Sequence, residues 1–126
     1  MIEPQPLEIR LERRGDATFV ELFGEFDMAE KQRFESALAP LASGVDSPGL
    51  VVDLRGLTFM DSTGLRCLLE LREKSREVGF ELKVINGTGP VRRVLSLTGI
   101  DSILPMCDAP EVPDHGRRRE TGVLAA

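Results

Sequence analysis

The chain has few of the residues that build catalytic or metal sites. It contains no tryptophan, no tyrosine, one histidine (His115) and two cysteines, Cys67 and Cys107. Two cysteines so far apart do not form a disulfide framework or the usual spacing of metal ligands. One histidine without a buried partner in view leaves no Ser-His-Asp or Cys-His arrangement within the chain. We therefore expect a protein that is not an enzyme and that holds no metal or cofactor.

Basic residues and long hydrophobic runs are also scarce. Lys and Arg number 16 against 21 Asp and Glu, a net charge of −5, whereas nucleic-acid surfaces need a basic footprint and usually stacking rings. The one basic run, Arg117 to Arg119, is interpreted as part of a solvated tail. The longest apolar run is far below the roughly 20 residues that span a bilayer, and the first residues lack the pattern of a secretory signal. We expect a cytoplasmic protein with no membrane or nucleic-acid partner.

The periodicity of the remaining sequence predicts an α/β domain. Residues 7–13 and 17–23 read as two strands, and the turn Arg14-Gly15-Asp16 between them predicts an antiparallel hairpin. The β-β-α-β-α-β-α order predicts a small mixed sheet with right-handed crossovers and helices over one or both faces. The other expected strands are 50–54, 80–85 and a short one at 103–104, and the expected helices begin after Asp27, near Ser62 and at Pro90.

The composition changes near residue 107. Beyond it, prolines, glycines and charged residues leave little apolar surface to bury. We therefore expect residues 1–106 to form the domain and residues 107–126 to be a flexible or loosely docked tail.

The sequence Asp61-Ser62-Thr63-Gly64 stands between the central strand and an amphipathic helix, and it allows two interpretations. In the first, Asp61 or Ser62 is an ordinary N-cap that accepts backbone N–H bonds. In the second, a hydroxyl at the helix start carries a phosphate of about −1.5 to −2 charges, which free N–H groups and the helix dipole partly offset. Asp27 likewise opens a capping box with Glu30.

Three stretches resemble the STAS domain of bacterial anti-sigma factor antagonists. Residues 24–27 (Gly-Glu-Phe-Asp) are similar to a motif that follows the family's second strand. Residues 53–65, which include Met-Asp-Ser-Thr-Gly-Leu, are similar to its long and specific signature. Residues 91–100 resemble its last helix, with Thr-Gly at the exit. The resemblance covers about residues 7–106 and implies a small mixed sheet with helices mainly on one side.

The resemblance also implies a mechanism of partner switching. Ser62 matches the serine that the anti-sigma factor, a kinase with bound ATP, phosphorylates, and a phosphatase would reverse the modification. The unmodified form would bind that kinase and release a sigma factor. The residues expected to bind the partner are the matching Asp27, Asp61, Ser62, Thr63 and Gly64, together with Arg66.

The chain departs from the family pattern in two places. Members commonly have a small residue where this chain has Arg66, and a long cation there favours an acidic complement. Members also commonly end in a further amphipathic helix beyond the one matched by residues 91–100, and the Pro-rich segment after Cys107 does not resemble it.

Two other functions stay open at this point. A nucleotide-hydrolysing or phosphotransfer enzyme is disfavoured because Asn86-Gly87-Thr88-Gly89-Pro90 lacks the glycine-rich, lysine-containing pattern of a phosphate loop. A STAS adaptor subunit of a transport or stress-sensing assembly, with no phosphorylation switch, is the alternative within the family.

Overall fold

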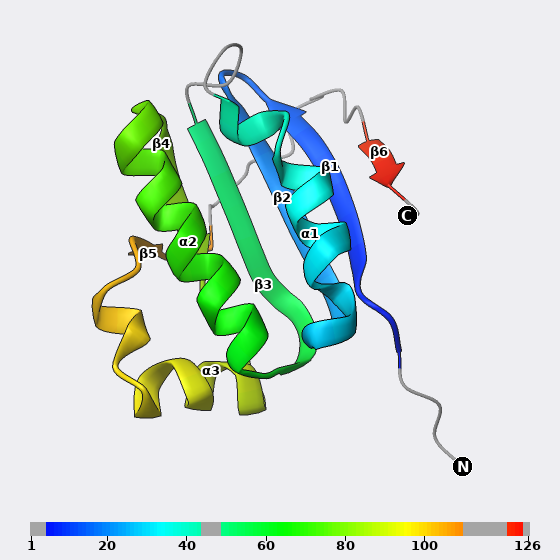
Figure 1. Ribbon diagram of the computed structural model, residues 1–126, viewed down its shortest axis with the longest axis vertical. Coiled ribbons are helices and arrows are strands. Elements are labelled where there is room, and N and C mark those ends of the chain that lie inside the picture. Colours follow the sequence, from blue (N-terminus) through cyan, green and yellow to red (C-terminus); the bar gives the residue numbers. More distant parts are fainter. Residues whose placement is uncertain (1–4, 44–48, 110–120, 125–126) are drawn as a thin grey trace.

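The computed structural model describes residues 5–43, 49–109 and 121–124. Six strands, three α-helices and three short 3-10 helices follow one another along this part of the chain (Figure 1). They are β1 (Glu8–Arg14), β2 (Ala17–Phe26), η1 (Met28–Glu30), α1 (Lys31–Leu38), η2 (Leu41–Ser43), β3 (Gly49–Met60), α2 (Ser62–Val78), β4 (Glu81–Ile85), α3 (Gly89–Leu97), η3 (Ile100–Ser102), β5 (Met106–Cys107) and β6 (Thr121–Leu124).

The six strands form one mixed sheet in the order β5-β4-β3-β2-β1-β6. β1 pairs antiparallel with both β2 and β6, whereas β2, β3, β4 and β5 run parallel. The predicted hairpin is confirmed, and Gly15 turns it with a φ of 59°. The predicted mixed sheet is therefore confirmed, with the hairpin at one side and the parallel strands at the other.

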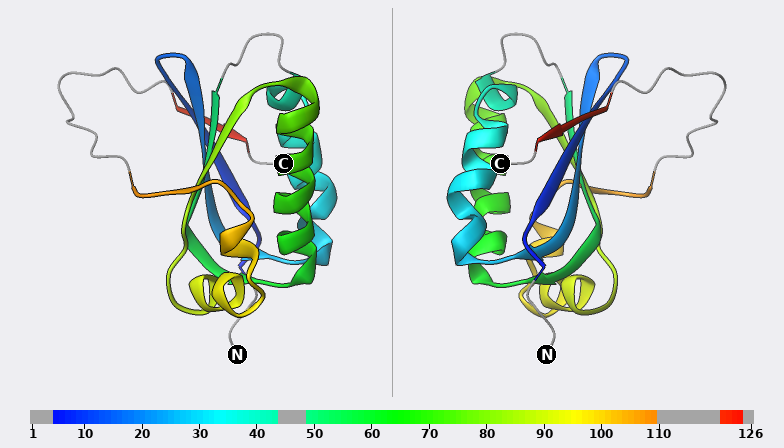
Figure 2. Two further views of the ribbon diagram at one scale, coloured as in Figure 1. Left: turned by 90° about the vertical axis from the view of Figure 1, so that its left-hand side faces the viewer. Right: turned by 90° about the vertical axis from the view of Figure 1, so that its right-hand side faces the viewer.

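The helices cover mainly one face of the sheet, as the family resemblance implies. α1 and α2 lie side by side on that face, and α3 packs at the end of the sheet (Figure 2). Between these helices and the sheet lies the core, in which Phe26, Val52, Leu68 and Leu95 are at most 1% exposed. The buried face of α2, with Leu65, Leu68, Leu71 and Ser75, is the one that its helical spacing predicts.

The central strand is longer than its sequence indicates. Strand β3 continues past the expected end at Leu54 to Met60, and it stays paired with β2 across two β-bulges. In the first, three steps of β3 from Asp53 to Gly56 oppose the two steps from Glu21 to Phe23. In this second half of β3, exposed residues and Gly56 interrupt the apolar run. The sequence alone therefore predicts that the strand ends at Leu54.

The end of the chain also differs from expectation. The last short strand is Met106–Cys107 rather than residues 103–104, since Ile103 still donates its N–H to Ile100 in the turn that closes η3. Residues 121–124 form β6 beside β1. Most of the expected tail, residues 110–120 and 125–126, lies outside the described residues, and the boundary at 106 stays a prediction.

A substitution at Gly56 tests how tightly the first bulge of β3 packs against β2. A Cβ at this position would lie 2.6 Å from the carbonyl oxygen of Leu22 and 2.3 Å from the Phe23 ring. Because backbone blocks the added atom, we expect Gly56→Ala to lower the free energy of unfolding by about 1–3 kcal/mol in urea titrations. Gly49→Ala is the control: its nearest neighbour is the Ala17 Cβ at 3.3 Å, and its loss should stay below about 1 kcal/mol. Equal losses would contradict this account.

Candidate functional site

The site is built where two parallel strands end side by side. Phe26, the last residue of β2, pairs with Met60, the last residue of β3. The register continues one residue further, since the Asp61 N–H donates to the Phe26 carbonyl oxygen at 3.2 Å. The residue after each strand is an aspartate, and so Asp27 and Asp61 follow adjacent strand ends at the same edge of the sheet.

Both aspartates cap the helical turn that follows them. Asp61 Oδ1 accepts the N–H of Thr63 at 2.8 Å and that of Gly64 at 3.3 Å. Asp27 Oδ1 accepts the N–H of Ala29 at 3.0 Å. The capping interpretation is thus confirmed for both carboxylates. The capping box itself is not formed as expected, because the Glu30 carboxylate pairs with Arg33 one turn later.

Ser62 is the first residue of α2 and is exposed. Within the described part of the chain, nothing forms a hydrogen bond with its hydroxyl. The neighbouring amides are less available than the sequence indicates: Asp61 takes those of Thr63 and Gly64, and the Leu65 N–H donates to the Asp61 carbonyl oxygen at 3.2 Å. The helix start therefore presents a free hydroxyl beside a carboxylate, with most of its donors already used.

Gly64 allows α2 to begin tightly against both strand ends. A Cβ at this position would lie 2.4 Å from Met60 Cγ and 3.2 Å from Phe26 Cγ. The residue is buried, unlike its neighbours Ser62 and Thr63. The glycine thus sets how close the serine lies to the sheet edge.

Exposed apolar side chains and a cation are found on several elements at this end of the sheet. Met28, directly after Asp27, is 76% exposed, and Phe59, near the end of β3, is 45% exposed. Leu97 is 80% exposed at the end of α3, which packs at this same end of the sheet (Figure 1). Arg66 is exposed one helical turn after Ser62. The sequence identifies Arg66 as a candidate, whereas the exposure of Met28 and Leu97 is not predicted by it.

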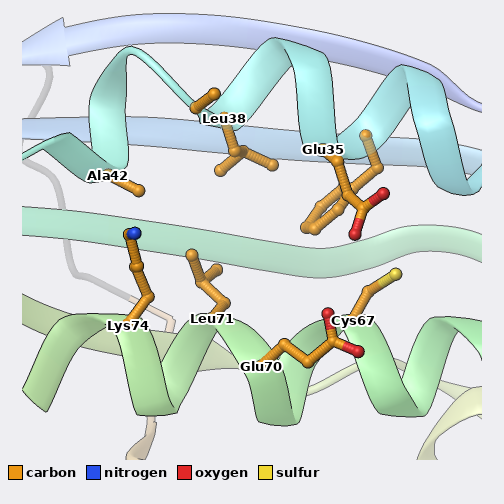
Figure 3. Close-up of a pocket in the computed structure, with 9 residues that line it drawn as sticks. Glu35, Leu38, Ala42, Cys67, Glu70, Leu71 and Lys74 are labelled. Carbon is orange, nitrogen blue, oxygen red and sulfur yellow. The ribbon is translucent and has the colours of Figure 1, made fainter. Parts of the chain in front are cut away.

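A groove between α1 and α2 lies on the helical face of the molecule. It has a volume of about 290 Å³, and Glu35 and Glu70 approach one another across it beside Cys67 (Figure 3). Burial, with a smaller contribution from the two glutamates, raises the pKa of the Cys67 thiol to about 11. Among residues 5–43, 49–109 and 121–124, no group of three His, Cys, Asp or Glu side chains is placed to hold a metal ion.

Comparisons with known proteins agree with this architecture. The model of the STAS domain family matches residues 8–111. An anti-sigma F factor antagonist from Paenibacillus polymyxa is 28% identical over 102 residues, which are 81% of this chain and 87% of that protein. The crystal structure of an anti-sigma factor antagonist from Mycobacterium paratuberculosis is 29% identical, with a TM-score of 0.73 over 86% of this chain and 92% of that one.

A further likeness concerns the fold alone. The anti-sigma factor antagonist SpoIIAA, solved in its unphosphorylated form, is 23% identical, with a TM-score of 0.68 over 82% of this chain and 89% of that one. None of the helices in the described residues is long and apolar enough to cross a membrane.

The capping role of Asp61 can be separated from its charge. Asp61→Ala removes the acceptor of two amides, and we expect it to lower the free energy of unfolding by about 1 kcal/mol. Asp61→Asn keeps an oxygen that accepts these amides but has no charge, and its loss should be only a few tenths of a kcal/mol. Thermal and urea unfolding measure both variants. A loss from Asp61→Asn as large as that from Asp61→Ala would contradict the cap.

Cys67 should be almost unreactive in the folded protein. With its pKa near 11, the thiol carries little thiolate near pH 8, and it is only 3% exposed. Alkylation followed by mass spectrometry should modify Cys107, which is partly exposed, well before Cys67 until urea unfolds the chain. The raised pKa also means that stability falls with rising pH once unfolded thiols ionise, from about pH 8.5 to 11. Equal alkylation rates in native buffer would refute the buried placement.

Proposed function

This chain belongs to the STAS domain family, and we propose that it is an anti-sigma factor antagonist that works by partner switching. The observation that carries the proposal is Ser62, exposed at the first position of α2 directly after the capping Asp61 and within the family-like signature. The relatives named antagonists support it, since the matched regions cover most of this chain.

The unmodified protein binds an anti-sigma factor and so releases a sigma factor. The proposed contact surface comprises the strand ends, the start of α2 and the exposed cation of its second turn. Its residues are Asp27, Asp61, Ser62, Thr63, Gly64 and Arg66. This assignment implies the cytoplasm, where sigma factors act and ATP is available.

The anti-sigma factor is also proposed to be the kinase that ends the interaction. The Ser62 Oγ attacks the γ-phosphorus of ATP held by that kinase, the hydroxyl proton passes to a base of the kinase, and ADP leaves. A phosphatase later hydrolyses the phosphate ester with water and restores the hydroxyl. This chain supplies the accepting hydroxyl and no catalytic group.

The phosphate reverses binding through charge. It adds about −1.5 to −2 charges at the helix start, beside the Asp61 carboxylate, whose Oδ1 already holds the nearest amides. Like charges forced together at an interface cost several kcal/mol, and each 1.4 kcal/mol is a factor of about ten in affinity. The fold itself need not change, because Ser62 points to solvent and the buried face of α2 begins at Gly64.

Binding of Ser62 variants to the anti-sigma factor tests this function. Ser62→Ala should bind as the unmodified protein does and take up no phosphate from the kinase and ATP. Ser62→Asp places one charge at the site, and we expect roughly tenfold weaker binding by calorimetry. Ser102→Asp adds the same charge at an exposed serine in η3, outside the proposed surface, and should bind normally. Phosphate mapped elsewhere than Ser62, or equal binding of Ser62→Ala and Ser62→Asp, would favour the adaptor role without a switch.

A further inference from the structure

Ser62 and Arg66 stand one turn apart on the same helix. α2 runs without interruption from Ser62 to Val78, and both side chains are exposed. Residues four apart on a helix are neighbours, with Cβ atoms about 5–6 Å from each other. A group attached to the Ser62 hydroxyl thus lies within reach of the Arg66 guanidinium.

The Arg66 guanidinium has no partner among the residues that the structure describes. This side chain forms no ion pair or hydrogen bond with the side chains and backbone of that part of the chain. It borders a shallow depression on α2 together with Glu70 and Glu73, yet neither carboxylate lies within ion-pair distance. Glu70 follows Arg66 by four residues, and this order of base before acid is the weaker one on a helix, since it opposes the dipole.

A phosphate on Ser62 would meet Arg66 in the stronger order. It precedes the base by four residues and lies at the positive end of the helix. Few other donors remain nearby, because Asp61 already accepts the amides of Thr63 and Gly64. A cation would therefore stabilise the phosphate, and Arg66 is the one that α2 provides at this spacing.

We propose that phosphorylation of Ser62 draws Arg66 onto the phosphate, so that the modification adds negative charge and withdraws the cation that the unmodified site offers to a partner. This inference rests on the proposed phosphorylation of Ser62. Phosphorylation then has two simultaneous effects on binding. The phosphate repels acidic groups of the partner, and Arg66 no longer attracts them.

Phosphorus NMR of the full chain tests the pairing. Phosphoserine is incorporated at position 62 during translation, so that the sample does not depend on any kinase, and the phosphate is titrated at low ionic strength. A guanidinium favours the dianion, and so Arg66→Ala should raise the titration midpoint by about 0.3 of a pH unit, the size of an exposed i, i+4 pair. Arg66→Lys should restore part of the change.

Arg76→Ala is the matched control, because this exposed arginine lies on the same helix, roughly 20 Å from Ser62 along its axis. The charged groups that act on the first turns of α2, which include Asp61, Lys31, Glu35 and Glu70, are unchanged in all variants. A midpoint that moves only with Arg66 supports the pairing, and high salt should weaken the effect.

An unchanged midpoint in Arg66→Ala, or the same change in Arg76→Ala, overturns the inference. That result is distinct from failure of the proposed function, which would appear as a kinase reaction that leaves Ser62 of the ordinary protein unmodified.

Discussion

The hydrogen bond from the Asp61 N–H to the Phe26 carbonyl oxygen fixes the geometry on which the site depends. It continues the parallel register of β2 and β3 to the last residues of both strands. Because the strands are parallel, both chains leave the sheet at one edge, and the two residues that leave first are Asp27 and Asp61. A shift of one residue in β3 would move Asp61 to the other face of the sheet, and α2 would begin elsewhere. The two bulges are therefore part of the site, since they set which residue of β3 reaches the edge.

Asp61 affects both the stability of α2 and the way in which the Ser62 hydroxyl is presented to a partner. Its carboxylate satisfies two amides of α2, and this leaves the helix start poorly suited to bind a free anion, because a helix N-terminus attracts anions through unsatisfied N–H groups. The same arrangement suits the display of a hydroxyl. The serine is held in a defined position by a capped helix, and Gly64 presses that helix against Met60 and Phe26. A covalent phosphate would then be an exposed charge rather than a ligand absorbed by the fold.

The sequence predicts regular and periodic elements better than interrupted ones. The hairpin of β1 and β2 and the buried face of α2 follow from alternation and helical spacing, and both are confirmed. The second half of β3 could not be predicted, because a bulge depends on the partner strand and Gly56 reads as a break when seen alone. The serine loop was identified because polar residues follow a buried strand and precede an amphipathic helix. Which amides Asp61 occupies, and whether Arg66 has a partner, depend on side-chain geometry that no local pattern encodes.

The guanidinium of Arg66, unpaired within the described residues, differs from two other arginines of the fold, which are held in ion pairs. On the face of the sheet away from α1 and α2, Arg14 pairs with Glu12 and Arg55 with the buried carboxylate of Asp53, and the hydrogen bond to Asp53 raises the pKa of Arg55 further. Those guanidinium groups are held within the fold, and exchanging them for contacts with a partner would leave carboxylates unpaired at a cost. Arg66 carries no such cost. In a chain of net charge −5, the Arg66 guanidinium can pair either with an acidic partner or with a phosphate. It lies one helical turn from Ser62, the residue whose phosphorylation would change its partner.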